Sequence, residues 1–234
     1  MMVKKWENLP RELQIAKVRP YYEIMRKKQG SLLAKRIFDV VVSALMLVIL
    51  SPVFLVLAIA IKLDSPGPVF YRQVRVTQYG KVFRIFKFRS MVSNADKIGA
   101  QVTVGNDSRI TRVIRSCRLD EICQLIDIFR GIMTFVGTRL EVPKYVAAYT
   151  PEMMATLLLP ACVTSEASIR YKDESALLDA AENVDQVYIR QVLPRKMQYN
   201  LDAIRSFGFW SDIRTMLRTV KAVLGKPEQT RVSA

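Results

Sequence analysis

Residues 35–62 constrain the fold more than any other stretch, because they contain a long apolar run between basic flanks. The run itself, IFDVVVSALMLVILSPVFLVLAIAI at residues 37–61, carries a single charged side chain, Asp39. A straight helix of this length would reach about 37 Å, more than the roughly 30 Å of a bilayer's hydrocarbon core. Ser51 and Pro52 lie near its middle, and a proline there removes a helical hydrogen bond and clashes with the preceding turn. The sequence therefore predicts two helices joined at a break.

Cations flank the run on both sides. Those before it are Lys27, Lys28, Lys35 and Arg36, and those after it are Lys62, Arg72, Arg75, Lys81, Arg84, Lys87 and Arg89. Basic flanks are retained in the cytoplasm, so a simple span would leave one flank on the wrong side. A re-entrant helix that bends at Ser51-Pro52 avoids this conflict, and the Ser51 hydroxyl could bond a carbonyl that Pro52 frees. We favour the re-entrant helix; a transmembrane span and a buried core helix of a soluble protein stay open as alternatives.

The net charge of the chain, +15 over 234 residues, requires an acidic partner. Nucleic acid, anionic lipid and a phosphorylated substrate all qualify. Nucleic acid leaves the apolar run unexplained, so we expect anionic membrane lipid and a phosphorylated substrate, and no nucleic acid. The chain has no histidine, which excludes Ser-His and Cys-His catalysis. Any metal should then be a hard cation held by carboxylates, and the three cysteines should be core residues in a reducing compartment.

The chain divides into four parts by composition. We expect a basic extension with short surface helices at residues 1–34, the re-entrant helix at 35–62, a cytosolic, membrane-associated domain at 63–224, and a disordered tail at 225–234. For the extension, a solvated segment is favoured over an extra interaction region. The expected fold class is mainly α with short β elements (α+β).

Local patterns predict the elements of the third part. Alternation of apolar and basic residues predicts a short hairpin or an extended pair over residues 69–76 and 81–88, followed by a polar loop at 92–108. Helical spacing of Leu119, Ile122, Cys123, Ile126 and Phe129 predicts a helix that stops at Gly131. We expect a turn at 137–138 and then a helix, a loop over 161–175, and helices over 176–204 with an interruption at Pro194. The last helix, Phe209 to Leu224, is amphipathic, and its apolar face could pack on the core or lie in a membrane interface.

The adjacent acids Asp120 and Glu121 are candidate catalytic residues. Acids in a first helical turn often do no more than complement the helix dipole. Neighbours on a helix point about 100° apart, so one acid could attack a substrate while the other holds a metal. Arginines 109, 112, 115 and 118 recur at helical spacing just before them, where a solvated basic face is the simplest interpretation. Beside a membrane segment, however, arginines and carboxylates favour a phosphate-ester site, because guanidinium groups bind phosphate oxygens and carboxylates can attack phosphoryl groups.

Six motifs in a fixed order carry a resemblance to a known family. They are KRIFDVVVSALMLVILSP, IKLDSPGPVFYRQVR, FKFRSM, NDSRITRVIR, LDE and VGTRLEVPKYV. With them the chain resembles the bacterial sugar transferases, the monotopic phosphoglycosyl transferases that load a hexose-1-phosphate onto a polyprenyl phosphate. The likeness covers residues 35 to about 150 and continues more weakly through DQVYI at 185–189 and the last helix.

The resemblance implies an enzyme, a phosphotransferase for substituted phosphate groups. It would move a sugar-1-phosphate from a UDP-sugar to undecaprenyl phosphate, with release of UMP, as the first membrane step of glycan synthesis at the cytoplasmic face of a bacterial inner membrane. Asp120 would be the nucleophile of a covalent aspartyl-phosphosugar intermediate, and Glu121 with Asp120 would bind Mg²⁺. The residues implied in substrate and phosphate binding are Lys87, Arg89, Arg115, Arg139 and Glu141. The oligomeric state stays open, a homodimer included.

Some positions depart from the family pattern. Arg118 replaces the usual serine before LDE, Cys123 stands where proline is frequent, GPRPE is written GTRLE, and PGITG is replaced by PACVTSEAS at 160–168. These changes leave Asp120 and Glu121 in place and fall in the half of the domain expected to shape the sugar pocket. Two rival functions remain: a non-catalytic membrane adaptor derived from this family, and a nucleic-acid-binding protein.

Overall fold

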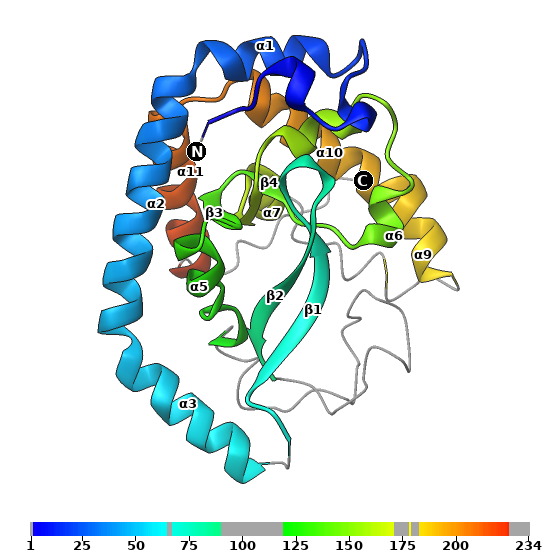
Figure 1. Ribbon diagram of the computed structural model, residues 1–234. Coiled ribbons are helices and arrows are strands. Elements are labelled where there is room, and N and C mark those ends of the chain that lie inside the picture. The colour runs from blue at the N-terminus through cyan, green and yellow to red at the C-terminus, as the bar shows by residue number, and fades with distance from the viewer. Residues whose placement is uncertain (1, 65–66, 90–118, 171–177, 179–182, 225–234) are drawn as a thin grey trace, which may run out of the picture.

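A long helix, α2 (Gln29–Ile49), runs along one side of the protein and continues after a bend into α3 (Ser51–Asp64), as Figure 1 shows. The computed structural model describes residues 2–64, 67–89, 119–170, 178 and 183–224. Helices predominate and the strands are short, which confirms the expected class, mainly α with short β elements.

The break between α2 and α3 lies where the sequence predicts it. The two helix axes differ by 60°, and one residue, Leu50, separates the helices. Pro52 has no N–H to donate to the carbonyl of Val48, four residues back. The hydroxyl of Ser51 donates to that carbonyl instead, at 2.8 Å. The predicted break and the predicted role of the Ser51 hydroxyl are both confirmed.

The two helices expose much of their apolar surface. Val48 is 72% exposed and Leu63 is 83% exposed. Other exposed apolar side chains of α2 and α3 are Leu33, Ile37, Val41, Leu45, Ile49, Val53, Leu55, Val56 and Ile59. A fully buried core helix is therefore the wrong interpretation of this stretch. Within the described residues no single helix has the length and hydropathy needed to cross a membrane; the bent pair meets that test only when both helices are counted together.

A β-hairpin follows, as predicted. β1 (Phe70–Val76) pairs antiparallel with β2 (Val82–Phe88), with Tyr71 opposite Lys87 and Arg75 opposite Phe83. Their tip is a short 3₁₀ turn, η3 (Gln78–Gly80), in which Tyr79 has a positive φ of 61°. Residues directly opposite share one face of an antiparallel pair, so Lys87 and Arg75 lie on the same face of the hairpin.

A second, parallel sheet was not predicted. Its strands are β3 (Met133–Val136), β4 (Thr138–Arg139) and β5 (Ala161–Thr164), in the order β3-β5-β4. The prediction of a loop over 161–175 is wrong for its described part, which holds β5 and α7 (Glu166–Arg170). Gly137 lets the chain pass between β3 and β4, because a Cβ there would lie 3.1 Å from the Thr134 methyl group and 3.3 Å from the Pro160 carbonyl oxygen.

Several further helices lie between and after these strands. They are α5 (Gln124–Phe129), α6 (Pro143–Val146), the 3₁₀ helix η6 (Met153–Leu158), α9 (Val184–Val187), α10 (Leu193–Arg205) and α11 (Phe209–Leu224). A π-helical turn, η7 (Tyr188–Val192), joins α9 to α10, and Pro194 stands in the first turn of α10. A proline's missing N–H costs little in a first turn, so the interruption expected at Pro194 takes the form of the π-helical turn before it.

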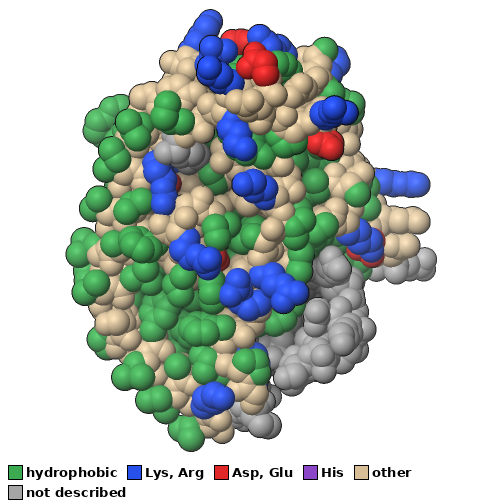
Figure 2. Space-filling model, in the orientation of Figure 1, with side chains coloured by type: hydrophobic (Ala, Val, Ile, Leu, Met, Phe, Trp, Pro, Cys, Tyr) green, Lys and Arg blue, Asp and Glu red, His purple; other side chains and the backbone are tan. Residues whose placement is uncertain are grey.

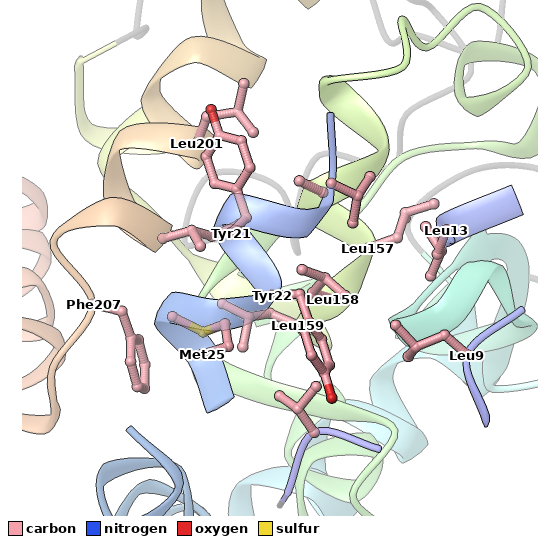
Figure 3. Close-up of a cluster of buried hydrophobic side chains, with 14 of the residues drawn as sticks. Leu9, Leu13, Tyr21, Tyr22, Met25, Leu157, Leu158, Leu159, Leu201 and Phe207 are labelled. Carbon is pink, nitrogen blue, oxygen red and sulfur yellow. The ribbon is translucent and has the colours of Figure 1, made fainter. Parts of the chain in front are cut away.

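The N-terminal residues form three short helices that pack on the core. They are η1 (Trp6–Asn8), η2 (Arg11–Leu13) and α1 (Arg19–Lys27). Figure 3 shows Leu9, Leu13, Tyr21, Tyr22 and Met25 of this segment in one cluster with Leu157 and Leu158 of η6, Leu159 just after it, Leu201 of α10 and Phe207 beyond that helix. Because these N-terminal side chains are buried, the expectation of a solvated extension is wrong for the described residues.

Candidate active site

The acids Asp120 and Glu121 lie in a 3₁₀ turn, η5 (Leu119–Glu121), just before α5. The sequence predicts one helix from Leu119, and the structure divides it into this turn and α5. The helix ends as predicted at Gly131, which has a φ of 82°. Arg36 of α2 donates to the carbonyls of Ile128 at 2.7 Å and Phe129 at 2.9 Å, so the apolar helix α2 caps the end of α5.

Lys87, from the end of β2, reaches Glu121. Its Nζ lies 3.0 Å from Oε1 of Glu121, and the side chains of Lys87 and Glu121 are 22% and 39% exposed. Asp120 is also half-buried. The tertiary structure therefore brings together three of the predicted site residues, two acids and a lysine that lies 34 positions away in the chain.

An apolar cluster lies next to this site. Leu57 and Ile61 of α3 pack with Phe88 and Cys123. Phe88 follows Lys87 directly, and the thiol of Cys123 donates to the backbone carbonyl of Asp120 at 3.5 Å. Burial raises the pKa of the Cys123 thiol to about 12, so this cysteine stays protonated and inert. The acids therefore lie next to the second apolar helix.

Arg89 has a structural contact at the same end of the hairpin. The side chain is buried; its guanidinium donates to the Ile61 carbonyl at 3.2 Å, and its backbone N–H donates to Val69. The bond from the Arg89 guanidinium to Ile61 ties the hairpin to the last turns of α3. The role of Arg89 in phosphate binding stays a prediction.

Arg115 lies outside the described residues. The same holds for Arg109, Arg112 and Arg118, the expected loop at 92–108, Cys117, and the expected tail at 225–234.

Arg139 and Glu141 belong to a second polar group. Glu141 is buried and accepts a hydrogen bond from the Tyr188 hydroxyl at 2.7 Å, and the buried Lys196 donates to that hydroxyl at 3.1 Å. Burial raises the pKa of Glu141, while the nearby Lys196, Arg139 and Arg75 oppose the shift. Arg139 donates to the Ser168 hydroxyl at 3.4 Å.

Arg75 interacts with Glu141 of this second group and lies on the same face of the hairpin as Lys87. Burial lowers the pKa of the Arg75 guanidinium, and the Glu141 carboxylate partly compensates. Arg75 is opposite Phe83, four strand positions from Lys87, which corresponds to roughly 13 Å along the strand. One face of the hairpin thus carries a cation of each group. Sequence patterns predict no role for Tyr188 or Lys196 and indicate Arg75 only as a flanking cation, because isolated polar residues carry no local signal of a buried network.

The profile of the bacterial sugar transferase family matches residues 30–226. The chain belongs to this family. The resemblance inferred from the six motifs is thereby confirmed, and residues 1–29 lie outside the matched region.

Several named proteins are similar to the chain. A UDP-glucose:undecaprenyl-phosphate glucose-1-phosphate transferase of Caulobacter vibrioides is 33% identical over 198 residues, which cover 82% of the chain and 70% of the relative. A UDP-N-acetylgalactosamine-undecaprenyl-phosphate N-acetylgalactosaminephosphotransferase of Aeromonas hydrophila is 31% identical over 196 residues, 81% of the chain and 43% of the relative. An exopolysaccharide production protein of Rhizobium leguminosarum is 43% identical over 112 residues, 46% of the chain and 56% of that protein. The matched part is thus only about half of the latter two proteins.

Asp120 and Glu121 suit a Mg²⁺ ion that a substrate helps to bind. Within the described residues no group of three or more acidic, cysteine or histidine side chains could enclose a metal. Mg²⁺ is usually held by one or two carboxylates together with substrate phosphates and water, and does not need a complete protein cage. Two adjacent, half-exposed carboxylates therefore fit the ion that this transferase family implies.

Proposed function

We propose that this protein transfers a sugar-1-phosphate from a UDP-sugar to undecaprenyl phosphate and releases UMP. The observation that carries the proposal is the site itself, in which Lys87 pairs with Glu121 beside Asp120, and the adjoining Phe88 and Cys123 pack on apolar side chains of α3. Relatives that act on UDP-sugars and undecaprenyl phosphate support the same reaction. The product would begin a glycan on a lipid carrier, and the similarity to an exopolysaccharide production protein agrees with that.

Two displacements at phosphorus describe the reaction. A carboxylate oxygen of Asp120 attacks the sugar-bearing phosphorus, and the bond to the bridging oxygen breaks as UMP leaves with the electron pair. An oxygen of undecaprenyl phosphate then attacks the aspartyl-phosphosugar, and the Asp120 carboxylate leaves unchanged. The covalent intermediate lets a soluble donor and a lipid acceptor use one carboxylate in turn.

The neighbouring residues would bind charge that the donor brings. Glu121, with Asp120, would hold Mg²⁺, which neutralises the diphosphate and favours departure of UMP. Lys87 pairs with Glu121 at 3.0 Å and would contact a phosphate oxygen beside it. Arg139 and Arg115 would bind the rest of the nucleotide diphosphate through guanidinium forks.

Membrane association through α2 and α3 would bring the lipid substrate to this site. Figure 2 shows apolar side chains gathered along the side of the molecule that α2 and α3 form. Trp210, Leu217 and Val220 extend exposed apolar surface onto α11, while Phe209 of that helix packs edge-to-face on Phe38 of α2. A monomeric soluble protein rarely exposes so much contiguous apolar surface. We infer a re-entrant helix at the cytoplasmic face of a bacterial inner membrane, with anionic lipid balancing the net charge of +15.

Release of UMP tests the reaction. Purified protein in detergent is incubated with Mg²⁺, undecaprenyl phosphate and each of a panel of UDP-sugars, and reactions without the lipid serve as controls. We expect multiple turnovers with at least one sugar and only when the lipid is present. No UMP with any common UDP-sugar would support the adaptor instead, and salt-sensitive DNA binding without a detergent requirement would support the nucleic-acid-binding alternative.

Cysteine labelling tests the topology. We replace Cys117 by Ser and introduce single cysteines as Lys27→Cys and Pro68→Cys, one on each side of the α2–α3 pair. A membrane-impermeant maleimide should label both in inverted vesicles and neither in intact spheroplasts. Cys123 and Cys162 are buried, with thiol pKa values raised to about 12 by burial, and should stay unlabelled. Labelling of the two new cysteines from opposite faces would show a transmembrane span.

A further inference from the structure

Asp127 of α5 makes an unusual contact with the hairpin. Its Oδ2 accepts a hydrogen bond from the backbone N–H of Phe86 at 2.9 Å. β2 pairs with β1 along one edge, and among the strands that the structure describes none pairs with its other edge. The carboxylate therefore takes the place of a neighbouring strand at one point of that edge.

Burial of the Asp127 carboxylate costs free energy. Asp127 is fully buried, and its other oxygen, Oδ1, has no hydrogen-bond partner among the described residues. Burial also raises the pKa of Asp127, against the opposing effect of the Phe86 N–H. A half-satisfied buried carboxylate adds little to stability, because the lost hydration offsets much of the single bond. We therefore expect Asp127 to act on the position of β2 relative to α5 and not on stability.

The contact places Lys87 relative to the acids. Lys87 follows Phe86 directly, so the two Cα atoms are about 3.8 Å apart and an anchored Phe86 amide restricts Lys87 too. Asp127 belongs to α5, which begins just after the turn that carries Asp120 and Glu121. The Phe86 ring is held as well, since the Arg72 guanidinium lies 3.6 Å from its centroid.

We propose that Asp127 is a positioning residue that docks β2 on α5 and thereby holds Lys87 against Glu121. Its catalytic consequence rests on the proposed function, and its structural consequence does not. A Phe86 amide without this acceptor would leave the end of β2 free to shift, and a shift of about 1 Å in a phosphate-binding group can cost 10²-fold in rate.

Amine labelling tests the positioning without any assay of activity. The full chain in detergent is treated briefly with acetic anhydride, and modification of each lysine is measured by mass spectrometry. Asp127→Leu keeps the branched shape of the side chain, with larger methyl groups in place of the oxygens, and removes the acceptor, whereas Asp127→Asn keeps an acceptor oxygen for the Phe86 N–H. We expect a several-fold faster modification of Lys87 in Asp127→Leu and a much smaller change in Asp127→Asn.

The reactivity of other lysines serves as a control that distinguishes a local shift of Lys87 from a general loosening of the fold. Lys35 and Lys196 are buried, at 3% and 4% exposure, and Lys144 has a side chain that is 51% exposed. All three should react as in the original protein. Unchanged reactivity of Lys87 in Asp127→Leu would overturn the proposal, and so would a rise shared with Lys35 and Lys196, since Asp127 would then act on stability alone.

A double-mutant cycle tests the catalytic consequence. We expect Asp127→Leu to lower kcat/KM for UMP release by about 10- to 100-fold, with a smaller loss in Asp127→Asn. In a Lys87→Met background, Asp127→Leu should cause little further loss, because the two residues act through one contact. Full additivity of the two losses would overturn the proposal. Absence of UMP release in the original protein would refute the proposed function, and the lysine labelling would still decide the positioning.

Discussion

Asp120→Asn is expected to abolish turnover, with a fall in the rate of UMP release of at least about 10⁴-fold, as large as for loss of a nucleophile elsewhere. The amide has nearly the shape of the carboxylate but cannot form the aspartyl-phosphosugar. The measurement is UMP release with Mg²⁺, undecaprenyl phosphate and the preferred UDP-sugar. In a single turnover without the lipid acceptor, the original protein should also retain labelled sugar phosphate covalently, and the variant should not.

Asp202→Asn is the matched control. It makes the same chemical change at an exposed carboxylate of α10 that pairs with Arg205 at 2.8 Å. Surface pairs of this kind contribute little to stability, so activity should stay within about twofold of the original. Full activity of Asp120→Asn would exclude Asp120 as the nucleophile, and equal losses in both variants would point to a general effect of removing a carboxylate.

Tyr22→Ala should lower the free energy of unfolding by about 3 to 5 kcal/mol, the range for large aromatic truncations in cores. Tyr22 is 1% exposed, and its ring packs edge-to-face on the Trp6 ring, with the two ring centroids 5.0 Å apart. Truncation would open a cavity in the cluster of Figure 3, between the N-terminal helices and η6. Total stabilities are typically about 5–15 kcal/mol, so the loss should be visible in denaturant or thermal unfolding of the detergent-solubilised protein.

Glu23→Ala is the control for this variant. Glu23 is the next residue in α1, its side chain is 41% exposed, and it pairs with Arg19 on the surface. We expect a change below about 1 kcal/mol. The comparison decides whether the segment before the family match belongs to the folded core. Equal effects of the two substitutions would show that this segment contributes little to stability.

Several elements could be predicted because their causes are local. A proline in the interior breaks any helix, so the break at Pro52 could be predicted. The neighbouring Ser51 hydroxyl donates a hydrogen bond to the Val48 carbonyl that the proline leaves without a donor. Alternating residues around a short polar turn are enough to predict the hairpin. Gly131 ends α5 because it adopts a positive φ at little cost.

Other features depended on contacts that no local pattern describes. The strand β5 is four residues long and forms a sheet only because β3 and β4 lie on either side of it. Parallel strands pair across long connections, so a short buried strand resembles a loop in the sequence. The N-terminal segment has a basic composition typical of a solvated extension, yet Leu13 and Tyr22 find an apolar surface provided by residues after 150.

For the site itself, the sequence alone determined which chemistry is available: a chain without histidine, with the adjacent acids Asp120 and Glu121, a large positive charge and a broken apolar helix. Only the tertiary structure decided which cation of the described residues pairs with Glu121. Lys87 reaches Glu121, whereas the neighbouring Arg89 turns to the carbonyl of Ile61. The physical reason is that residue type sets charge and local backbone preference, while distance between remote residues is set by packing of β2 on α5 and α3, to which the whole chain contributes.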